Sequence, residues 1–292
     1  MDADGTPARA ELDRLLGALR PKLHRYCARM TGSVIDGEDV VQEAFVKALQ
    51  AFPATASVSH LEAWLFRIAH NAALDFLRRR ARREATHADE DPDMMIDPAE
   101  RDPLAAAASL RTFMRLPVAQ RSAVILMDVL GCSLEEIGEA TNSTLAAVKA
   151  ALHRGRTRLR ELAREPDDAV VPALAAPERA RLADYVARFN ARDFDTIRAM
   201  LADEVGLDLV NRSRLKGRSE VGRYFGNYAR TDGWRLVPGR VEGRPAVLVY
   251  EPTAATPAYF VLLEWHADRL AAIRDFRYAR YVMDGADVAV DP

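Results

Sequence analysis

The sequence predicts a multidomain chain with two small all-α units followed by a larger α+β unit. Apolar residues recur at helical spacing through most of residues 9–164, a pattern typical of packed amphipathic helices. Two proline-bearing stretches without that periodicity indicate linkers. Helical segments and then alternating apolar segments follow the second linker, as in an α+β fold. The predicted order is domain 9–83, linker 84–103, domain 104–164, linker 165–177 and domain 178–292.

Composition narrows the class of protein. The chain has 292 residues and a formal net charge of −2, so overall basicity does not point to nucleic acid. Arginines nevertheless cluster at 78–83 and 153–164, with acidic residues between them at 84–102. The sequence has two cysteines, Cys27 and Cys132, which argues against a disulfide scaffold and for a reducing compartment.

Location and cofactors are predicted from what the sequence lacks. No stretch approaches the roughly 20 apolar residues of a membrane span, and no signal peptide precedes the first helix. His24 and Cys27 share a helical face, but two ligands are too few for a zinc site. We therefore expect a cytoplasmic protein with no membrane contact, no metal and no cofactor.

Residues 134–161 predict a helix, a turn and a second helix rich in arginine. Ser133 and Glu136 have the spacing of a capping box, and turn and cap formers occupy 141–144. The apolar stripe of the second helix is Leu145, Val148, Leu152, Leu159 and Leu162. Its basic residues are Lys149, His153, Arg154, Arg156, Arg158 and Arg160. This is typical of a helix-turn-helix that enters the DNA major groove, and a solvated amphipathic hairpin is the alternative.

Further helices are predicted upstream. Residues 9–30 form an amphipathic helix that Pro21 kinks or splits. Residues 36–52 are predicted to form a helix that buries one apolar face. Its other face carries an acidic cluster, which either stabilises the helix through its dipole or docks a basic partner. That cluster is Asp39, Gln42 and Glu43. The helix over 60–83 ends in arginines that exceed what the dipole needs and are predicted to contact phosphates, among them Arg78, Arg79 and Arg80.

Two of these stretches carry a family resemblance. DGEDVVQEAFVKALQAF followed by AWLFRIAHNAALDFLRRR resembles region 2 of bacterial sigma factors of the extracytoplasmic-function class. LPVAQRSAVILMDVLGCSLEEIGEATNSTLAAVKAALHRGRTRLREL resembles their region 4. The resemblance implies a sigma factor that binds core RNA polymerase and directs promoter recognition and initiation. A one-component DNA-binding regulator with a ligand-sensing domain is the alternative.

The resemblance also implies sites. Asp39, Gln42 and Glu43 would dock on the polymerase. The loop 53–60, with His60 and Trp64 nearby, would hold the minus-10 element, with Trp64 itself expected in the core. Promoter readout at the minus-35 element would involve the start of the second helix, at Ser143, Thr144, Ala147, Lys149 and Ala150, with His153 further along the same helix. Arg154, Arg156 and Arg158 would hold phosphates. The acidic linker 84–103 would thread the polymerase channel, and a plain tether is the alternative.

The last domain resembles the SnoaL-like cone-shaped fold. The resemblance rests on LADYVARFNARDFDTIRAMLADEV, then GRSEVGRYF, then a terminal hairpin. Helices are predicted over 179–190, 195–203 and 219–228, followed by an antiparallel sheet. Such folds enclose a pocket, which leaves room for a small-molecule ligand; the groups available for catalysis are Asp208, His266 and Asp275. We expect regulation in cis by this domain rather than enzymatic activity.

Overall fold

The chain folds as two compact units, residues 1–168 and 169–292. The computed structural model describes residues 5–52, 61–84, 101–165, 173–230 and 233–291. The boundary between the units falls inside the predicted second linker. The loop 53–60 and most of both predicted linkers lie outside the described residues, so the expectations for them stay predictions.

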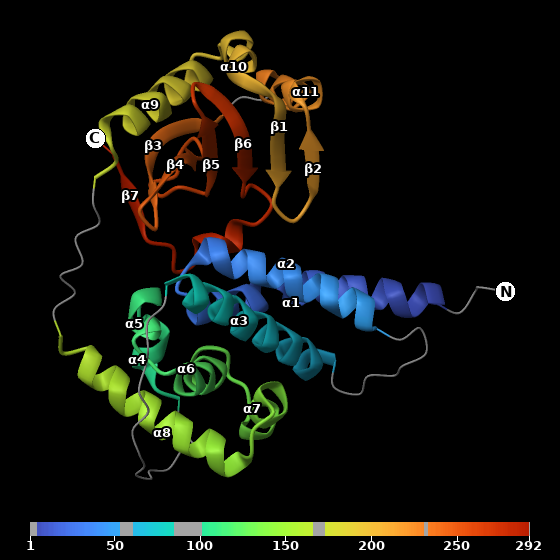
Figure 1. Cartoon of the computed structure of the whole chain (residues 1–292), viewed down its shortest axis with the longest axis vertical. Coiled ribbons are helices and arrows are strands. Elements are labelled where there is room, and N and C mark those ends of the chain that lie inside the picture. The colour runs from blue at the N-terminus through green and yellow to red at the C-terminus, as the bar shows by residue number, and fades with distance from the viewer. Residues whose placement is uncertain (1–4, 53–60, 85–100, 166–172, 231–232, 292) are drawn as a thin grey trace. The chain divides into compact units, whose positions relative to one another are not determined.

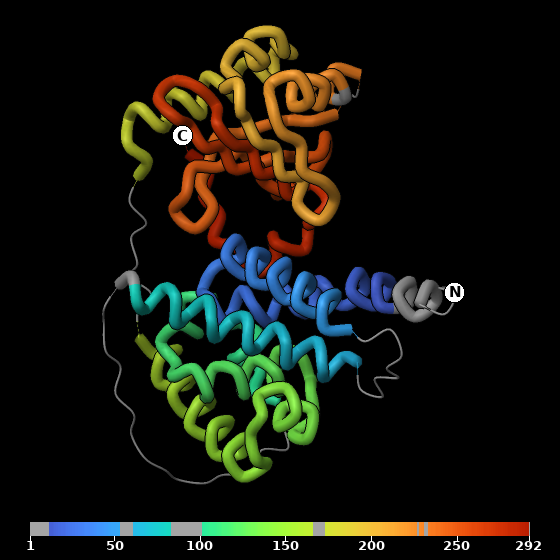
Figure 2. The backbone as a smooth tube through the Cα atoms, turned by 45° about the vertical axis from the view of Figure 1, so that its right-hand side comes forward, coloured from blue at the N-terminus to red at the C-terminus, as the bar shows by residue number. Residues whose placement is uncertain are grey.

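Long helices open the first unit. They are α1 (Gly5–Thr31), α2 (Val34–Ala51) and α3 (Leu61–Glu84), which lie side by side in Figures 1 and 2. α1 continues through Pro21, so the predicted split of that helix does not occur. The Ser33 hydroxyl caps α2 by accepting a hydrogen bond from the Asp36 amide at 3.1 Å. Gly37 brings α2 close to α1, since a Cβ there would lie 2.6 Å from the Cα of Ala28.

Shorter helices complete the first unit. They are α4 (Pro103–Ala107), α5 (Leu110–Met114), α6 (Val118–Val124), the π-helix η1 (Ile125–Val129), α7 (Leu134–Thr141) and α8 (Leu145–Leu162). α7 and α8 are the predicted helix-turn-helix. Its capping box is confirmed, because Ser133 accepts from the Glu136 amide at 3.2 Å and the Glu136 carboxylate accepts from the Ser133 amide at 2.7 Å.

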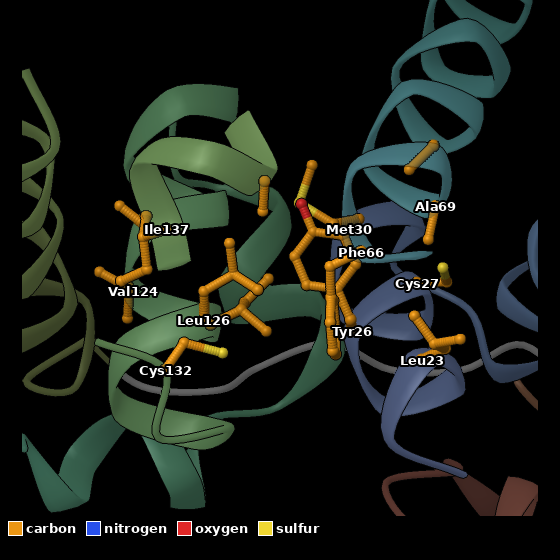
Figure 3. Packing of buried hydrophobic residues seen from close by; sticks show 14 of the residues in the cluster. Leu23, Tyr26, Cys27, Met30, Phe66, Ala69, Val124, Leu126, Cys132 and Ile137 are labelled. Carbon is orange, nitrogen blue, oxygen red and sulfur yellow. The ribbon is translucent and has the colours of Figure 1, made fainter. Parts of the chain in front are cut away.

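The hydrophobic core of this unit is continuous across both predicted α domains. Figure 3 shows Tyr26 and Met30 of α1 beside Leu126 of η1, and all three belong to the same buried cluster. The Arg121 guanidinium, also buried, donates a 2.6 Å hydrogen bond to the Met30 carbonyl. The two stretches predicted as separate domains therefore pack against each other.

The second unit has the predicted α+β plan. Its helices are α9 (Ala176–Asn190), α10 (Phe194–Met200), α11 (Arg218–Ala229) and the 3-10 helix η2 (Arg280–Met283). Its strands are β1 (Leu201–Leu209), β2 (Ser213–Lys216), β3 (Arg235–Val241), β4 (Arg244–Tyr250), β5 (Tyr259–His266), β6 (Arg269–Asp275) and β7 (Val288–Val290). Among the described residues they form one sheet in the order β2-β1-β6-β5-β4-β3-β7.

Two predictions for this unit were wrong. The sheet is not antiparallel throughout, because β1 runs parallel to β6, with Leu207 beside Ile273. The long connection between these strands allows the parallel pairing. The helix predicted over 195–203 ends at Met200, where the chain becomes extended to enter β1.

Helices and sheet share a core rich in aromatic rings. α9 packs on β3 and β4, and α11 packs on β1 and β2 (Figure 1). The Phe189 ring lies edge-on to Phe194 and Tyr228, with centroid distances of 5.3 and 5.1 Å. These ring pairs tie α9 to α10 and α11, which fixes the helices over the sheet.

Candidate nucleic-acid interface

Local hydrogen bonds set the start of the second helix of the helix-turn-helix. Asn142 ends α7 in the left-handed conformation, with φ 52°, which asparagine tolerates better than most residues. The Thr144 hydroxyl then accepts a 3.2 Å hydrogen bond from the Ala147 amide and caps α8. The chain therefore turns sharply at the predicted position and begins α8 with its first turn defined.

The back of α8 is packed against α6. A Cβ at Gly155 would lie 2.6 Å from Val124 Cγ2 and 3.2 Å from the Gln120 carbonyl oxygen, so glycine permits this close approach. The predicted apolar stripe is buried at Val148, Leu152, Leu159 and Leu162. Leu145 is a correction, since it lies at the first turn of α8 and 45% of it is exposed.

The opening turns of α8 present the predicted base-reading residues to solvent. Ser143, Thr144, Ala147 and Lys149 are exposed, and Ala150, His153 and Arg154 are half-buried. An exposed helix start on a buried back is the geometry with which recognition helices enter the major groove. The same residues remain candidates for DNA contact.

Arg156 has a different environment from its neighbours. Its Nε donates to Asp128 Oδ2 at 3.0 Å and its terminal nitrogen to Asp128 Oδ1 at 2.6 Å. The two side chains are 8% and 0% exposed. The hydrogen bonds to Asp128 raise the pKa of the Arg156 guanidinium. A buried cation held in this way pins α8 to η1, so we leave Arg156 out of the candidate phosphate contacts.

Arginines further along α8 are more exposed. Arg158 pairs with Glu161 at 2.8 Å, one helical turn away, and both side chains are about half exposed. Arg160 reaches Asp102 at the start of α4, also at 2.8 Å. An exposed pair such as Arg158–Glu161 stabilises a fold little, so Arg158 can exchange Glu161 for a phosphate at low cost.

The arginines at the end of α3 contact their own unit. Arg78 lies 3.4 Å from Asp75, Arg79 bonds Glu43 at 2.7 Å, and Arg80 donates to the Thr31 carbonyl at 2.9 Å. Arg78 is the most exposed of the three, with 68% of its side chain accessible. These interactions orient the basic end of α3, and the phosphate role of all three stays a prediction.

The acidic face of α2 is partly engaged. Asp39 is exposed, whereas Gln42 and Glu43 are half-buried. Glu43 bonds both Arg79, at 2.7 Å, and Lys47, at 2.8 Å. Burial acts to raise the pKa of Glu43, but the hydrogen bonds from Arg79 and Lys47 outweigh it and lower that pKa. Asp39 is therefore the more exposed carboxylate of this face.

Sequence reasoning missed buried charges that organise the unit. Glu38, at 0% exposure, pairs with Arg20 of α1. Arg121 donates to the carbonyls of Met30 and Leu116, at 2.6 and 2.9 Å, and burial and the charge of Arg80 lower its pKa to about 10. The signal was present, because Asp128 and Glu38 stand where apolar residues would be expected and a buried carboxylate needs a cation.

Trp64 packs beside the core as expected. Trp64 is half-buried and packs on Phe52, with ring centroids 6.3 Å apart.

The candidate catalytic groups of the second unit are dispersed. His266 is exposed at the β5–β6 turn. Asp208 stands opposite Arg274 on the neighbouring strand, so Asp275, the next residue, faces the other side of the sheet. The structure does not bring Asp208, His266 and Asp275 together.

Two absences apply to the part of the chain that the structure describes. None of its helices is both long and apolar enough to span a membrane. Within the same residues, no group of three or more histidine, cysteine, aspartate or glutamate side chains could hold a metal ion.

Comparison with known proteins agrees with this geometry. Residues 15–83 match Sigma-70 region 2, and residues 110–159 match Sigma-70 region 4. The ECF RNA polymerase sigma factor SigG of Mycobacterium tuberculosis is 31% identical over 205 residues, covering 61% of this chain. This chain spans only 55% of the length of SigG.

A shorter relative is covered almost entirely. The ECF RNA polymerase sigma factor SigW of Bacillus subtilis is 31% identical over 159 residues, which are 50% of this chain and 85% of SigW. The crystal structure of Mycobacterium tuberculosis extracytoplasmic function sigma factor SigJ is 21% identical, covers 88% of this chain and 93% of that one, and has a TM-score of 0.33. The match to SigW over most of its length, with both region matches in order, shows that this chain belongs to the extracytoplasmic-function RNA polymerase sigma factors.

Proposed function

We propose that this protein binds core RNA polymerase and directs it to promoters, and that residues 178–292 regulate that activity in cis. The observation that carries the proposal is α8, whose first turns are exposed while its back is fixed by the buried Arg156–Asp128 pair. A rigid helix with an exposed leading edge suits readout of base edges in the major groove. Membership of the sigma-factor family supports the polymerase as partner.

The DNA-binding set follows from exposure. Ser143, Thr144, Ala147 and Lys149 are proposed to face the bases of a minus-35 element, with Ala150 and His153 beside them. Arg154 and Arg158, with the arginines ending α3, are proposed to hold phosphates. Lys149→Ala should weaken binding to one promoter sequence more than to others, whereas Arg158→Ala should weaken all sequences alike and reduce the salt dependence.

The polymerase-binding surface is proposed to centre on Asp39. Replacing both Asp39 and Glu43 by lysine should abolish co-purification with core polymerase, but this change also breaks the Glu43 bonds to Arg79 and Lys47. Asp39→Lys alone leaves those two Glu43 bonds in place. Its matched control is Asp13→Lys, the same change at an exposed position of α1.

The measurement is pull-down of the full chain with core polymerase, followed by transcription from a promoter template. Asp39→Lys should lose most binding while keeping the thermal unfolding of the parent, and Asp13→Lys should bind normally. Equal binding of Asp39→Lys and Asp13→Lys would remove Asp39 from the polymerase contact. Failure of the parent chain itself to bind and to direct initiation would refute the sigma-factor proposal.

The regulatory role is tested by shortening the chain. A chain ending near Asp168 retains the whole first unit, which has its own core and is compact by itself. A tethered domain has a high effective concentration, so even weak interactions of residues 178–292 would affect transcription. Identical activity and promoter choice of the full and shortened chains would refute regulation in cis.

A further inference from the structure

A cleft of about 930 Å³ lies on the second unit, beside α11. Its walls come from α10, α11 and the strands β1 and β2. Apolar side chains contribute part of the lining, with Leu209 from β1, Leu215 from β2 and the ring of Tyr224 from α11. The volume is within the range of small-molecule sites, and the lining combines apolar and charged groups, as ligand pockets do.

The charged lining is strongly basic. Four arginines border the cleft, and Glu220 is the acidic residue of the lining. The four are Arg198, Arg218, Arg223 and Arg230. Such an excess of cations around a hollow with partly apolar walls attracts anions.

Three of these arginines are paired with exposed carboxylates, and the loosest pair is Arg223 with Glu220, at 3.9 Å. Arg198 bonds Asp195 at 2.7 Å, and Arg218 lies 3.2 Å from Asp203. The Asp195 and Asp203 carboxylates are 96% and 87% exposed, and ion pairs this exposed stabilise a fold little, so an anionic ligand can replace these carboxylates at low cost. Backbone carbonyls orient the same two guanidiniums, that of Gly222 bonding Arg198 at 3.1 Å and that of Leu201 bonding Arg218 at 3.0 Å.

Glycines of α11 leave the cleft open. Gly222 and Gly226 both line it and stand one helical turn apart. A Cβ at Gly226 would meet no atom within 4 Å, and a Cβ at Gly222 would meet only Arg198, at 3.8 Å. Packing therefore requires neither glycine, although each costs a helix interior stability relative to alanine. Glycine without a packing need allows close approach of a ligand to the backbone.

Tyr224 connects the cleft to the centre of the sheet. Its hydroxyl donates to the carboxylate of Asp275, which is fully buried at the end of β6, and lies 2.8 Å from the Tyr228 hydroxyl. Tyr228 also donates to Asp275, at 3.2 Å, and the Arg277 amide donates at 2.8 Å. A ligand resting on the Tyr224 ring would thus touch a side chain held by the core.

We propose that this cleft binds a small organic anion with an apolar body, its charged group among Arg198, Arg218 and Arg223 and its apolar part against Leu209, Leu215 and Tyr224. The proposal deepens the regulatory role given above to residues 178–292 by naming the chemistry of the ligand. It is tested without polymerase, so either idea can fail while the other stands.

The experiment titrates the full chain with 8-anilinonaphthalene-1-sulfonate and follows its fluorescence. N-phenyl-1-naphthylamine, which has the same aromatic body without the sulfonate, is the comparison probe. The sulfonate probe should bind a single saturable site at least about tenfold more tightly than the uncharged probe. Salt raised from about 50 mM to about 500 mM should weaken only the sulfonate probe.

Variants then locate the site. Gly226→Leu fills the cleft while improving helix propensity, so it should weaken sulfonate binding about tenfold or more without lowering thermal stability. Gly17→Leu makes the same change at an exposed glycine of α1 with no atom within 4 Å of its Cβ, and binding should not change. Arg223→Glu, at a side chain that is 77% exposed, should weaken the sulfonate probe and spare the uncharged one.

Each outcome supports or overturns the site. Selective sulfonate binding that Gly226→Leu removes and Gly17→Leu retains would support it. Equal affinity for the two probes would overturn the anion preference. Unchanged sulfonate binding in Gly226→Leu, with its fold intact by thermal unfolding, would show that the cleft is not where the probe binds and would overturn the proposal.

Discussion

Replacing Arg156 tests whether this arginine belongs to the fold or to the DNA surface. Arg156→Met keeps an unbranched apolar stem but removes the guanidinium, which leaves Asp128, at 0% exposure, without its cation. Loss of one partner of a buried ion pair costs about 3–5 kcal/mol, because the remaining charge stays desolvated. For a protein of this size about 1 kcal/mol shifts the melting temperature by about 2–4 °C, so the expected drop is roughly 6–20 °C.

The assay is hydrogen exchange of the full chain, read on peptides from α6 and α8, together with thermal unfolding. Peptide-level exchange assigns the loss to the first unit, since the second unit has a core of its own. Arg158→Met is the matched control, because its pair with Glu161 is about half exposed, and its effect should stay within about 0.5 kcal/mol.

A double replacement sharpens the test. Asp128→Asn combined with Arg156→Met removes both charges, so the pair should lose less stability than the two single changes added together. If Arg156→Met leaves exchange and melting unchanged but weakens promoter binding, the structural role assigned to Arg156 is incorrect and the original DNA-contact prediction is right.

Two further predictions concern the first unit. Gly37→Ala should destabilise it by about 2 kcal/mol or more, because the new methyl group meets the Ala28 backbone. Gly17→Ala is the control and should stabilise α1 by up to about 1 kcal/mol, since its methyl group meets no atom. Urea unfolding that ranks the two variants in the opposite order would contradict the packing argument. Burial and the nearby charge of Arg78 lower the pKa of His70 to about 4 from its ordinary 6.5. As the pH falls, the imidazole is therefore protonated in the unfolded chain before it is protonated in the folded one. The stability that this histidine contributes is present above pH 6.5 and is lost as the pH falls towards 4. His70 should therefore contribute a loss of about 2 kcal/mol between pH 7 and pH 5 that His70→Asn lacks, and equal pH dependence of the two proteins would count against this burial effect.

Local signals made the helix-turn-helix predictable. The capping box of Ser133 and Glu136 and the cap at Thr144 act within a few residues, so sequence spacing was sufficient to place α7 and α8. The turn between β3 and β4 is equally local, because it depends on Gly243, whose φ of 76° suits glycine. Interactions confined to one turn of chain are visible in one sequence.

Long-range pairings were not predictable in this way. Asp128 and Arg156 are 28 residues apart, and nothing local identifies them as partners. The parallel pairing of β1 with β6 also depends on the whole second unit. β2 was missed because its residues are almost all exposed at the sheet edge, so apolar alternation is absent. Exposure of Leu145 depends on where α7 ends, which periodicity does not reveal.

If the protein binds promoters as proposed, the continuous core of the first unit limits how far its two halves can reach along the DNA. Elements centred near minus-10 and minus-35 lie roughly 25 base pairs apart, or about 85 Å of duplex at about 3.4 Å per pair. A packed unit of the length of residues 1–168 has a radius of gyration of about 15 Å. While Arg121 stays bonded to Met30, the protein can hold one element but not span both. Under the proposed function, engaging the two at once would separate α1 from η1, and binding to polymerase and DNA would have to compensate for the apolar surface that this opening exposes to water.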